Sequence, residues 1–237
     1  MVLLPDPILS DLPPDAVLGV GMFSSTPDGV ALPDGWEPLI FKKIPRHTRY
    51  TLVMEAGQKV VKANSEASSS GLIRKIRIDP RAYPLIEWRW KVLNIYQKGD
   101  VTTKAGDDYP ARLYITFESD PASMDLFEKL KYETARLLYG EYPPGGAITY
   151  IWESKTPKGS VVPNPYTDRV KMIVVESGDS LLHQWIQEER NVYEDYKSAF
   201  GQEPPMISGV AIMSDSDNTG ESTTAYYGDI IFKKSVK

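Results

Sequence analysis

The sequence contains no cysteine among its 237 residues. Disulfide bonds, thiolate metal sites and a cysteine nucleophile are therefore excluded. Histidine is nearly as scarce, because His47 and His183 are the two that the sequence contains. A metal site built from several histidines is excluded by number, and neither histidine has a GxSxG-type partner that would indicate a Ser-His-Asp triad.

Dense positive charge and long apolar runs are also lacking. The formal net charge is −5, and no Lys/Arg run has the density of a phosphate-binding surface, so no nucleic-acid partner is predicted. No run approaches the roughly 18 to 20 apolar residues of a transmembrane segment. The composition predicts a soluble chain, periplasmic or secreted where a signal peptide has been removed and cytoplasmic otherwise. The oligomeric state stays open.

The residues that are present are typical of one globular β-domain. Hydrophobic residues make up 41% and charged residues 25%, and all-β sandwiches reach this length as a single unit. Residues 1–38 hold seven prolines and little periodicity, which predicts an irregular arm packed on the domain. Residues 39–237 alternate short apolar runs with turn residues, which predicts a single β-sandwich of about ten strands.

Four segments alternate apolar and polar residues with the period of two that is typical of half-buried antiparallel strands. They are PLIEWRWKV, ARLYITFE, AITYIWES and RVKMIVVE. The predicted inward sets are Ile86, Trp88, Trp90 and Val92; Leu113, Ile115 and Phe117; Ile148, Tyr150 and Trp152; and Val170, Met172 and Val174. Arg74 shares the parity of apolar neighbours in its own segment, which predicts a structural partner or a bulge.

Two segments interrupt this pattern and are predicted to be short helical excursions. The first begins at Asp120-Pro121, has apolar residues at helical spacing and ends at Gly140. The second spans about 188–200 and is followed by Gly201.

Several strings resemble a bacterial family of unknown function, DUF3047. They are TTKAGDDYPARLYITF, VVPNPYTDRVKMIVVESG, ERNVYEDYKSAFGQEPP and ISGVAIMSDSDNTGESTTAYYGDIIF, and the resemblance runs from about Trp36 to the end. That family has no assigned reaction. The closing AYYGDIIF is similar to the last strand of galactose-binding-like jelly rolls, which implies an all-β antiparallel jelly-roll sandwich. Many such modules bind sugars, and some carry a structural calcium.

The outward residues of three of the alternating strands would form a cationic face if these strands shared one sheet. This predicted ligand-binding set is Glu87, Arg89, Lys91, Arg112, Tyr114, Arg169 and Lys171. Arginine binds carboxylates bidentately, so the face would suit an acidic oligosaccharide or polysaccharide. Trp36 and Trp185 are the tryptophans better placed to stack on a sugar. The alternative is that these are ordinary solvated side chains.

The segment SDSDNTG offers oxygen ligands of the kind that calcium prefers. The predicted metal set is Asp215, Asp217 and Asn218, with Asp229 as a further ligand. The alternative is an Asx-rich turn before the last strand. Adjacent Asp107 and Asp108 point apart in an extended chain, so a turn role is predicted for them.

The sequence thus favours a carbohydrate-binding or cell-envelope-associated module that recognises an acidic saccharide on a cationic sheet face and requires no cofactor. One alternative is a polysaccharide lyase or glycosidase on the same face. For the lyase, Arg46, His47, Arg49 and Tyr50 would supply the base and the charge neutraliser. The other alternative is a structural or protein-interaction domain.

Overall fold

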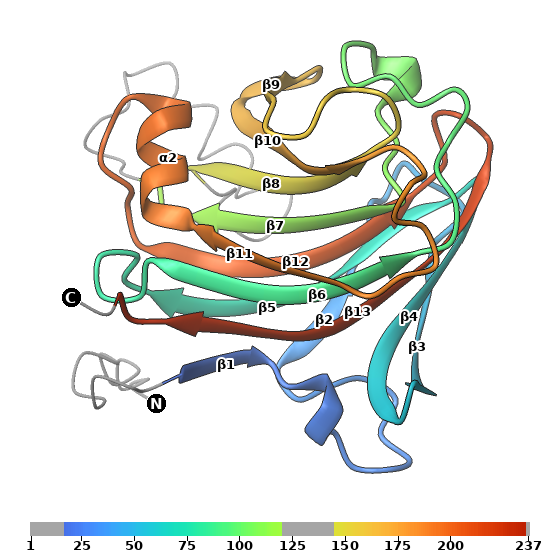
Figure 1. Ribbon diagram of the computed structural model, residues 1–237, viewed down its shortest axis with the longest axis horizontal. Helices are drawn as coiled ribbons and strands as arrows, with labels where there is room; N and C mark the ends of the chain where they lie inside the picture. The colour runs from blue at the N-terminus through green and yellow to red at the C-terminus, as the bar shows by residue number, and fades with distance from the viewer. Residues whose placement is uncertain (1–16, 120–144, 236–237) are drawn as a thin grey trace.

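A computed structural model of the chain describes residues 17–119 and 145–235. In this part, thirteen strands form two stacked sheets (Figure 1). Sheet A has the order β11-β6-β13-β4-β3, and β1 also pairs with β13. Its strands are β1 (Val17–Gly21), β3 (Arg49–Glu55), β4 (Gln58–Glu66), β6 (Leu85–Val92), β11 (Ile186–Asn191) and β13 (Ser222–Lys233). The predicted all-β sandwich is confirmed.

Sheet B has the order β2-β5-β12-β7-β8-β10-β9. Its strands are β2 (Trp36–Leu39), β5 (Ser69–Ile78), β7 (Ala111–Phe117), β8 (Gly146–Glu153), β9 (Val161–Asn164), β10 (Thr167–Ser177) and β12 (Ile207–Asp215). Two short 3-10 helices, η2 (Phe23–Ser25) and η3 (Lys104–Gly106), lie in loops. Among the described residues, no helix is long and apolar enough to cross a membrane.

The main core fills the space between the sheets with the inward residues of alternating strands. Trp88 and Trp90 on β6 are buried as predicted, and Trp88 stacks on Tyr150 of β8 with ring centroids 5.1 Å apart. Large aromatic side chains bury much apolar surface at a low cost in conformational entropy. The three side chains therefore join sheet A to sheet B at the centre of the sandwich.

The strand β8 differs from the half-buried strand that its alternation predicted. All its residues are buried, because Ile151 on its outer face packs in a second apolar cluster with Val101 and Tyr109 from the loop before β7. β8 also pairs in parallel with β10, whereas every other strand pair in the described residues is antiparallel. Burial on both faces is typical of strands covered by a connection.

The predicted helix at 188–200 is correct in its second half and wrong in its first. The segment 186–191 is strand β11, and α2 (Val192–Phe200) follows it. The Asn191 side chain accepts a hydrogen bond from the Glu194 amide, so it caps the helix, and Gly201 ends it with a φ of 71°. The helix predicted from Asp120 to Gly140 lies outside the described residues.

The described part of the predicted arm contributes a strand to each sheet. β1 pairs with β13, and β2 pairs with β5. The Val20 carbonyl accepts hydrogen bonds from Trp36 Nε1 at 3.1 Å and from an Arg74 guanidinium nitrogen at 2.6 Å. The partner of Arg74 is therefore a backbone carbonyl of the arm, and its inward parity needs no bulge in β5. The division between residues 38 and 39 stays a prediction.

Candidate ligand-binding surface

The predicted cationic face is divided between the two sheets. Arg89 and Lys91 lie on β6 in sheet A, whereas Arg112 and Tyr114 lie on β7 in sheet B. The prediction of one shared face is therefore wrong. Alternation fixes which side of its own strand a residue occupies, but it does not say which sheet the strand joins.

The predicted cations of β10 are also separated from Arg112. Lys171 is the register partner of Ile148, a core residue, and its ammonium lies 5.9 Å from the Phe200 ring of α2. Arg169 shares this parity and lies at the same end of the strand. The set predicted to face inward on β10 is wrong, because Met172 and Val174 pack in the second apolar cluster and not in the main core. Apolar residues occupy both faces of this strand, so its alternation did not show which face is inward. Lys171 therefore lies toward α2 and away from the outer face of sheet B.

Arg112 is an internal residue rather than part of an open surface. It is 2% exposed, and its guanidinium binds both carboxylate oxygens of Asp215, with Nε 2.9 Å from Oδ1. It also donates to the Asp107 carbonyl at 2.6 Å and to the Tyr114 hydroxyl at 3.1 Å, and it stacks on the Tyr109 ring at 4.2 Å. Burial raises the pKa of Asp215, and the Arg112 charge opposes this shift and favours the ionised carboxylate. This arrangement holds the loop before β7 against β12.

A three-carboxylate cluster lies beside this ion pair. Oxygens of Asp108, Asp215 and Asp217 lie within 4.8 Å of one another, which is close enough to hold a metal ion. Asp108 also accepts hydrogen bonds from the amides of Asn218, at 3.3 Å, and Thr219, at 2.5 Å. The sequence had predicted only a turn role for Asp108. Its proximity to Asp215 depends on the pairing of β7 with β12, which the sequence does not show.

The other two predicted metal ligands have different contacts. The side-chain amide of Asn218 donates to the Lys104 carbonyl at 2.8 Å and to the Tyr166 hydroxyl at 3.0 Å. Asp229 accepts a hydrogen bond from the Ser24 amide at 2.8 Å and another from its hydroxyl, so it binds η2. Asp229 is therefore not part of the carboxylate cluster, and its inclusion in the metal set was wrong.

The cationic-aromatic surface, as we name it, comprises Lys62, Arg89, Lys91, Trp185 and Tyr226 on the outer face of sheet A. The Tyr226 of β13 is the register partner of Lys62 on β4 and of Lys91 on β6. The Lys91 ammonium lies 4.5 Å from the Tyr226 ring centroid and 5.5 Å from that of Trp185, and Lys62 lies 5.8 Å from Tyr226. The Arg89 guanidinium stacks on Trp185 at 4.6 Å.

This surface has more positive than negative charge. Lys91 forms an ion pair with Glu55, and Arg89 donates a hydrogen bond to the Gln58 side chain. In the described part of the chain, neither Arg89 nor Lys62 has a carboxylate within ion-pair distance. Stacking on Trp185 holds the guanidinium plane while leaving N–H donors at its edge for an anion.

Glu87 lies on the same outer face, two residues before Arg89 on β6, whereas the second tryptophan predicted to stack on sugars lies away from it. Glu87 forms an ion pair with Lys233, and Trp36 is 5% exposed and packs edge-on against Phe23. Lys62 and Tyr226 were missed by sequence reasoning. Each lies in an alternating strand, but cross-strand register, which brings them together, is not visible in the sequence.

The residues proposed for a lyase do not form a common centre. His47 is exposed in the loop before β3, and its ring contacts the Ile44 carbonyl at 3.1 Å. The Tyr50 hydroxyl donates to the Ser70 carbonyl at 2.6 Å and accepts from the Ser214 amide at 3.1 Å. Burial raises the pKa of Tyr50 well above its usual value, so its hydroxyl is a structural group rather than a base.

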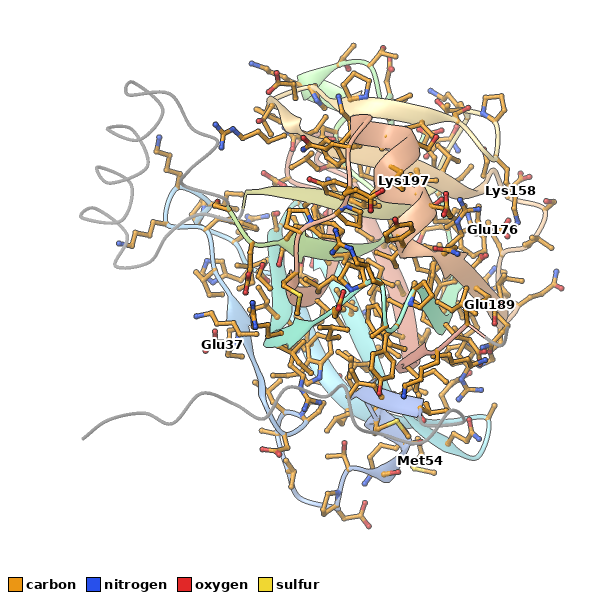
Figure 2. The ribbon with its side chains drawn as sticks, turned by 90° about the vertical axis from the view of Figure 1, so that its left-hand side faces the viewer. Glu37, Met54, Lys158, Glu176, Glu189 and Lys197 are labelled. Atoms are coloured by element: carbon orange, nitrogen blue, oxygen red, sulfur yellow. The ribbon has the colours of Figure 1, made fainter. Side chains whose placement is uncertain are left out.

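A pair of buried carboxyls lies between β10 of sheet B and β11, the edge strand of sheet A. Glu176 comes from β10 and Glu188 from β11. Burial raises the pKa of Glu188 to about 8, and the neighbouring Glu176 contributes to the shift. Figure 2 shows Lys158 beside Glu176, with a 2.5 Å ion pair between them. Two carboxyls that share a site cannot both ionise readily, so one holds a proton near neutral pH.

Solved structures with a similar fold include several carbohydrate-binding modules. The family 11 module of the cellulase Lic26A-Cel5E of Clostridium thermocellum has a TM-score of 0.47 and 9% identity, over 94% of this chain and 97% of that one. The carbohydrate recognition domain of Emp47p has a TM-score of 0.43 and 13% identity, over 93% and 95%. The CBM22-1 xylan-binding domain from Paenibacillus barcinonensis Xyn10C has a TM-score of 0.39 and 8% identity, over 94% and 97%. These likenesses concern the fold alone.

No curated protein matches the sequence. A family model does match, and it covers residues 34–231, which include every strand from β2 to β12 and most of β13. The chain therefore belongs to the family described as "Protein of unknown function (DUF3047)".

Proposed function

We propose that this protein is a carbohydrate-binding module that holds an acidic saccharide on the cationic-aromatic surface of sheet A. The observation that carries the proposal is the Arg89 guanidinium, which stacks on Trp185 and has no carboxylate partner among the described residues. A saccharide carboxylate would bind its N–H edge bidentately. The Lys62 ammonium beside Tyr226 offers a second positive charge for the next acidic unit of a polymer.

The same geometry supports binding rather than catalysis. Glu55, the carboxylate next to these cations, is already ion-paired with Lys91. A glycosidase needs two carboxyls that flank the reacting bond, and a lyase needs a base within hydrogen-bond reach of the proton that it removes. The described part of the surface assembles neither arrangement, so the enzyme alternative has no observation in its favour.

Calorimetric titration with an oligogalacturonate and with a neutral cello-oligosaccharide tests the proposal. We expect the acidic oligosaccharide to bind and its affinity to fall as salt is added, because exposed charges are screened. Arg89→Met should weaken binding at least about tenfold, since it removes a charge-assisted contact. Arg77→Met is the matched control, because Arg77 is an exposed arginine of sheet B that pairs with Glu118. Equal binding of both sugars, or none by the folded protein, would contradict the proposal.

For the carboxylate cluster we propose calcium as the metal that Asp108, Asp215 and Asp217 bind. The three side chains offer oxygen ligands within 4.8 Å of one another, and calcium takes oxygen ligands in flexible geometry. Arg112 already binds Asp215, so the ion would have to share this carboxylate with the guanidinium. Asp217 is the most accessible of the three, so substituting it should affect metal binding more than the fold.

Thermal and urea unfolding with calcium or with EDTA test the metal site. Calcium at a hundred times its dissociation constant should raise the free energy of unfolding by about 2.7 kcal/mol. Asp217→Asn should abolish this increase while leaving the Arg112–Asp215 pair intact. Asp229→Asn is the control, because Asp229 binds η2, and the calcium effect should persist in this variant. Unfolding that is the same in calcium and in EDTA would show that the three aspartates only anchor the turn.

A further inference from the structure

A cavity of about 660 Å³ lies between the loop after β1 and Arg74 in the middle of β5. Its walls include Met22, Pro27, Val30, Leu32, Trp36 and Arg74. Small-molecule sites in proteins have volumes of about 300 to 1,000 Å³ and are mostly apolar with a few polar groups that fix the ligand. This cavity shares no residue with the cationic-aromatic surface or with the carboxylate cluster.

Arg74 is the cation in this wall, and its charge is incompletely matched. It is partly buried, and it donates a hydrogen bond to the neutral Val20 carbonyl. Asp34 also lines the cavity but forms no ion pair with Arg74, which has no carboxylate partner among the described residues. A guanidinium has five N–H donors, and removing its charge from water is costly unless an anion compensates. The site is therefore complementary to a negatively charged group.

The backbone keeps space for this guanidinium. Gly35 has a φ of 75°, and a Cβ atom there would lie 3.3 Å from Arg74 Nε. A side chain at position 35 would be strained by the left-handed backbone and would crowd the arginine. Glycine at this position thus keeps the approach to Arg74 open.

The rim of the cavity exposes apolar side chains to solvent. Met22 is 43% exposed and Val30 is 42% exposed, and both rank among the exposed large hydrophobic residues of the described chain. Exposed apolar side chains that gather around a concave site mark ligand or partner contacts. An occupant would therefore gain by placing apolar groups against the rim and an anion on Arg74.

We propose that this cavity is a second binding site, which takes a small carboxylic acid with an apolar body. The ligand carboxylate binds the free N–H donors of Arg74, and its hydrocarbon part packs against Met22, Val30 and Trp36. This site is independent of the saccharide surface on sheet A.

Calorimetric titration of the full chain with octanoate, octanol and octyltrimethylammonium at pH 7 tests this proposal. We expect saturable binding of octanoate, at least about tenfold weaker binding of octanol, and none of the cation. Val30→Asp places a carboxylate at the rim and should weaken octanoate binding at least about tenfold. Val161→Asp is the matched control, since Val161 is 49% exposed on β9, and it should leave octanoate binding unchanged.

A second variant separates ligand binding from folding. Arg74→Met keeps the apolar stem, and its fold is checked by the unfolding midpoint, because Trp36 still holds the Val20 carbonyl. The folded variant should bind octanoate no more tightly than octanol. Equal binding of the two probes by the unmodified protein, no binding of either, or octanoate binding that survives Val30→Asp would each overturn the proposal. Oligogalacturonate binding should be the same in Val30→Asp, so failure of one site is distinguishable from failure of the other.

Discussion

Each sheet carries on its outer face an arginine stacked on an aromatic ring, but one arginine is buried and the other is not. On sheet A, Arg89 stacks on Trp185 at 4.6 Å, and on sheet B, Arg112 stacks on Tyr109 at 4.2 Å. Arg112 is 2% exposed and binds both oxygens of Asp215, whereas Arg89 has no carboxylate partner in the described part of the chain. What covers an outward arginine therefore decides whether it is buried in a structural ion pair or remains available to solvent.

The cover on sheet B comes from two connections. The loop before β7 contributes Val101 and Tyr109, and β9 contributes Val162, to the apolar cluster on the outer face of β8 and β10. Figure 1 shows β9 and the loop around η3 at the same end of sheet B. Once this cover excludes water, Arg112 must have a carboxylate partner, because an unpaired buried charge is costly.

The largest effect should come from breaking the covered pair. Asp215→Ala leaves the buried Arg112 charge without its main partner and should lower the free energy of unfolding by about 3 kcal/mol or more. Urea unfolding followed by tryptophan fluorescence measures the change. Replacing the pair together, as Arg112→Met with Asp215→Leu, should recover much of the loss. A loss below about 1 kcal/mol in Asp215→Ala would show that Arg112 is effectively solvated and that the two faces do not differ.

The sequence predicted the strands better than it predicted the site. Alternation in 85–92 and 111–117 placed Trp88, Trp90 and Leu113 in the core, because a strand that faces water on one side records this burial in its own pattern. The strand β11 was missed because 186–191 has no apolar alternation and runs directly into α2. Its partner β6 is distant in the sequence, and a local pattern does not show such pairing.

The site could be predicted in its chemistry but not in its location. Arg89, Lys91 and Trp185 were identified by residue type, and they do lie together. Their grouping with Arg112 failed because membership of a sheet depends on chain topology. The burial of Arg112 could not be predicted either. The loop that covers it is mostly polar, and Val101 and Tyr109 are its residues in the apolar cluster.

A change of pH acts on a different part of the molecule, the buried carboxyls between the two sheets. Burial and Glu176 raise the folded-state pKa of Glu188 from 4.5 to about 8. A raised pKa means that the folded protein holds the proton, so the stability from this group is complete below pH 4.5 and is lost as pH rises through about 8. With a discount for partial solvent contact, the loss should be about 2 kcal/mol.

The variant Glu188→Gln tests this assignment. Its stability, measured by urea unfolding between pH 5 and pH 9, should fall less steeply with pH than that of the unmodified protein. Glu189→Gln is the matched control, since Glu189 is an exposed neighbour on the same strand, and its pH profile should keep the original slope. A Glu188→Gln profile parallel to the original would place the titrating proton on another buried acid, such as Asp215.

The smallest effect on stability should come from the open face. Arg89→Met removes a half-buried cation–π contact and a hydrogen bond to Gln58, which together should change the free energy of unfolding by about 1 kcal/mol or less. Arg89→Lys keeps the charge but loses the flat guanidinium, so it should retain stability while it weakens carboxylate binding. If Arg89→Met were as destabilising as Asp215→Ala, Arg89 would be a structural residue like Arg112. That result would argue against the surface of sheet A as a binding site, because a residue that only contacts ligand should contribute little to the stability of the fold.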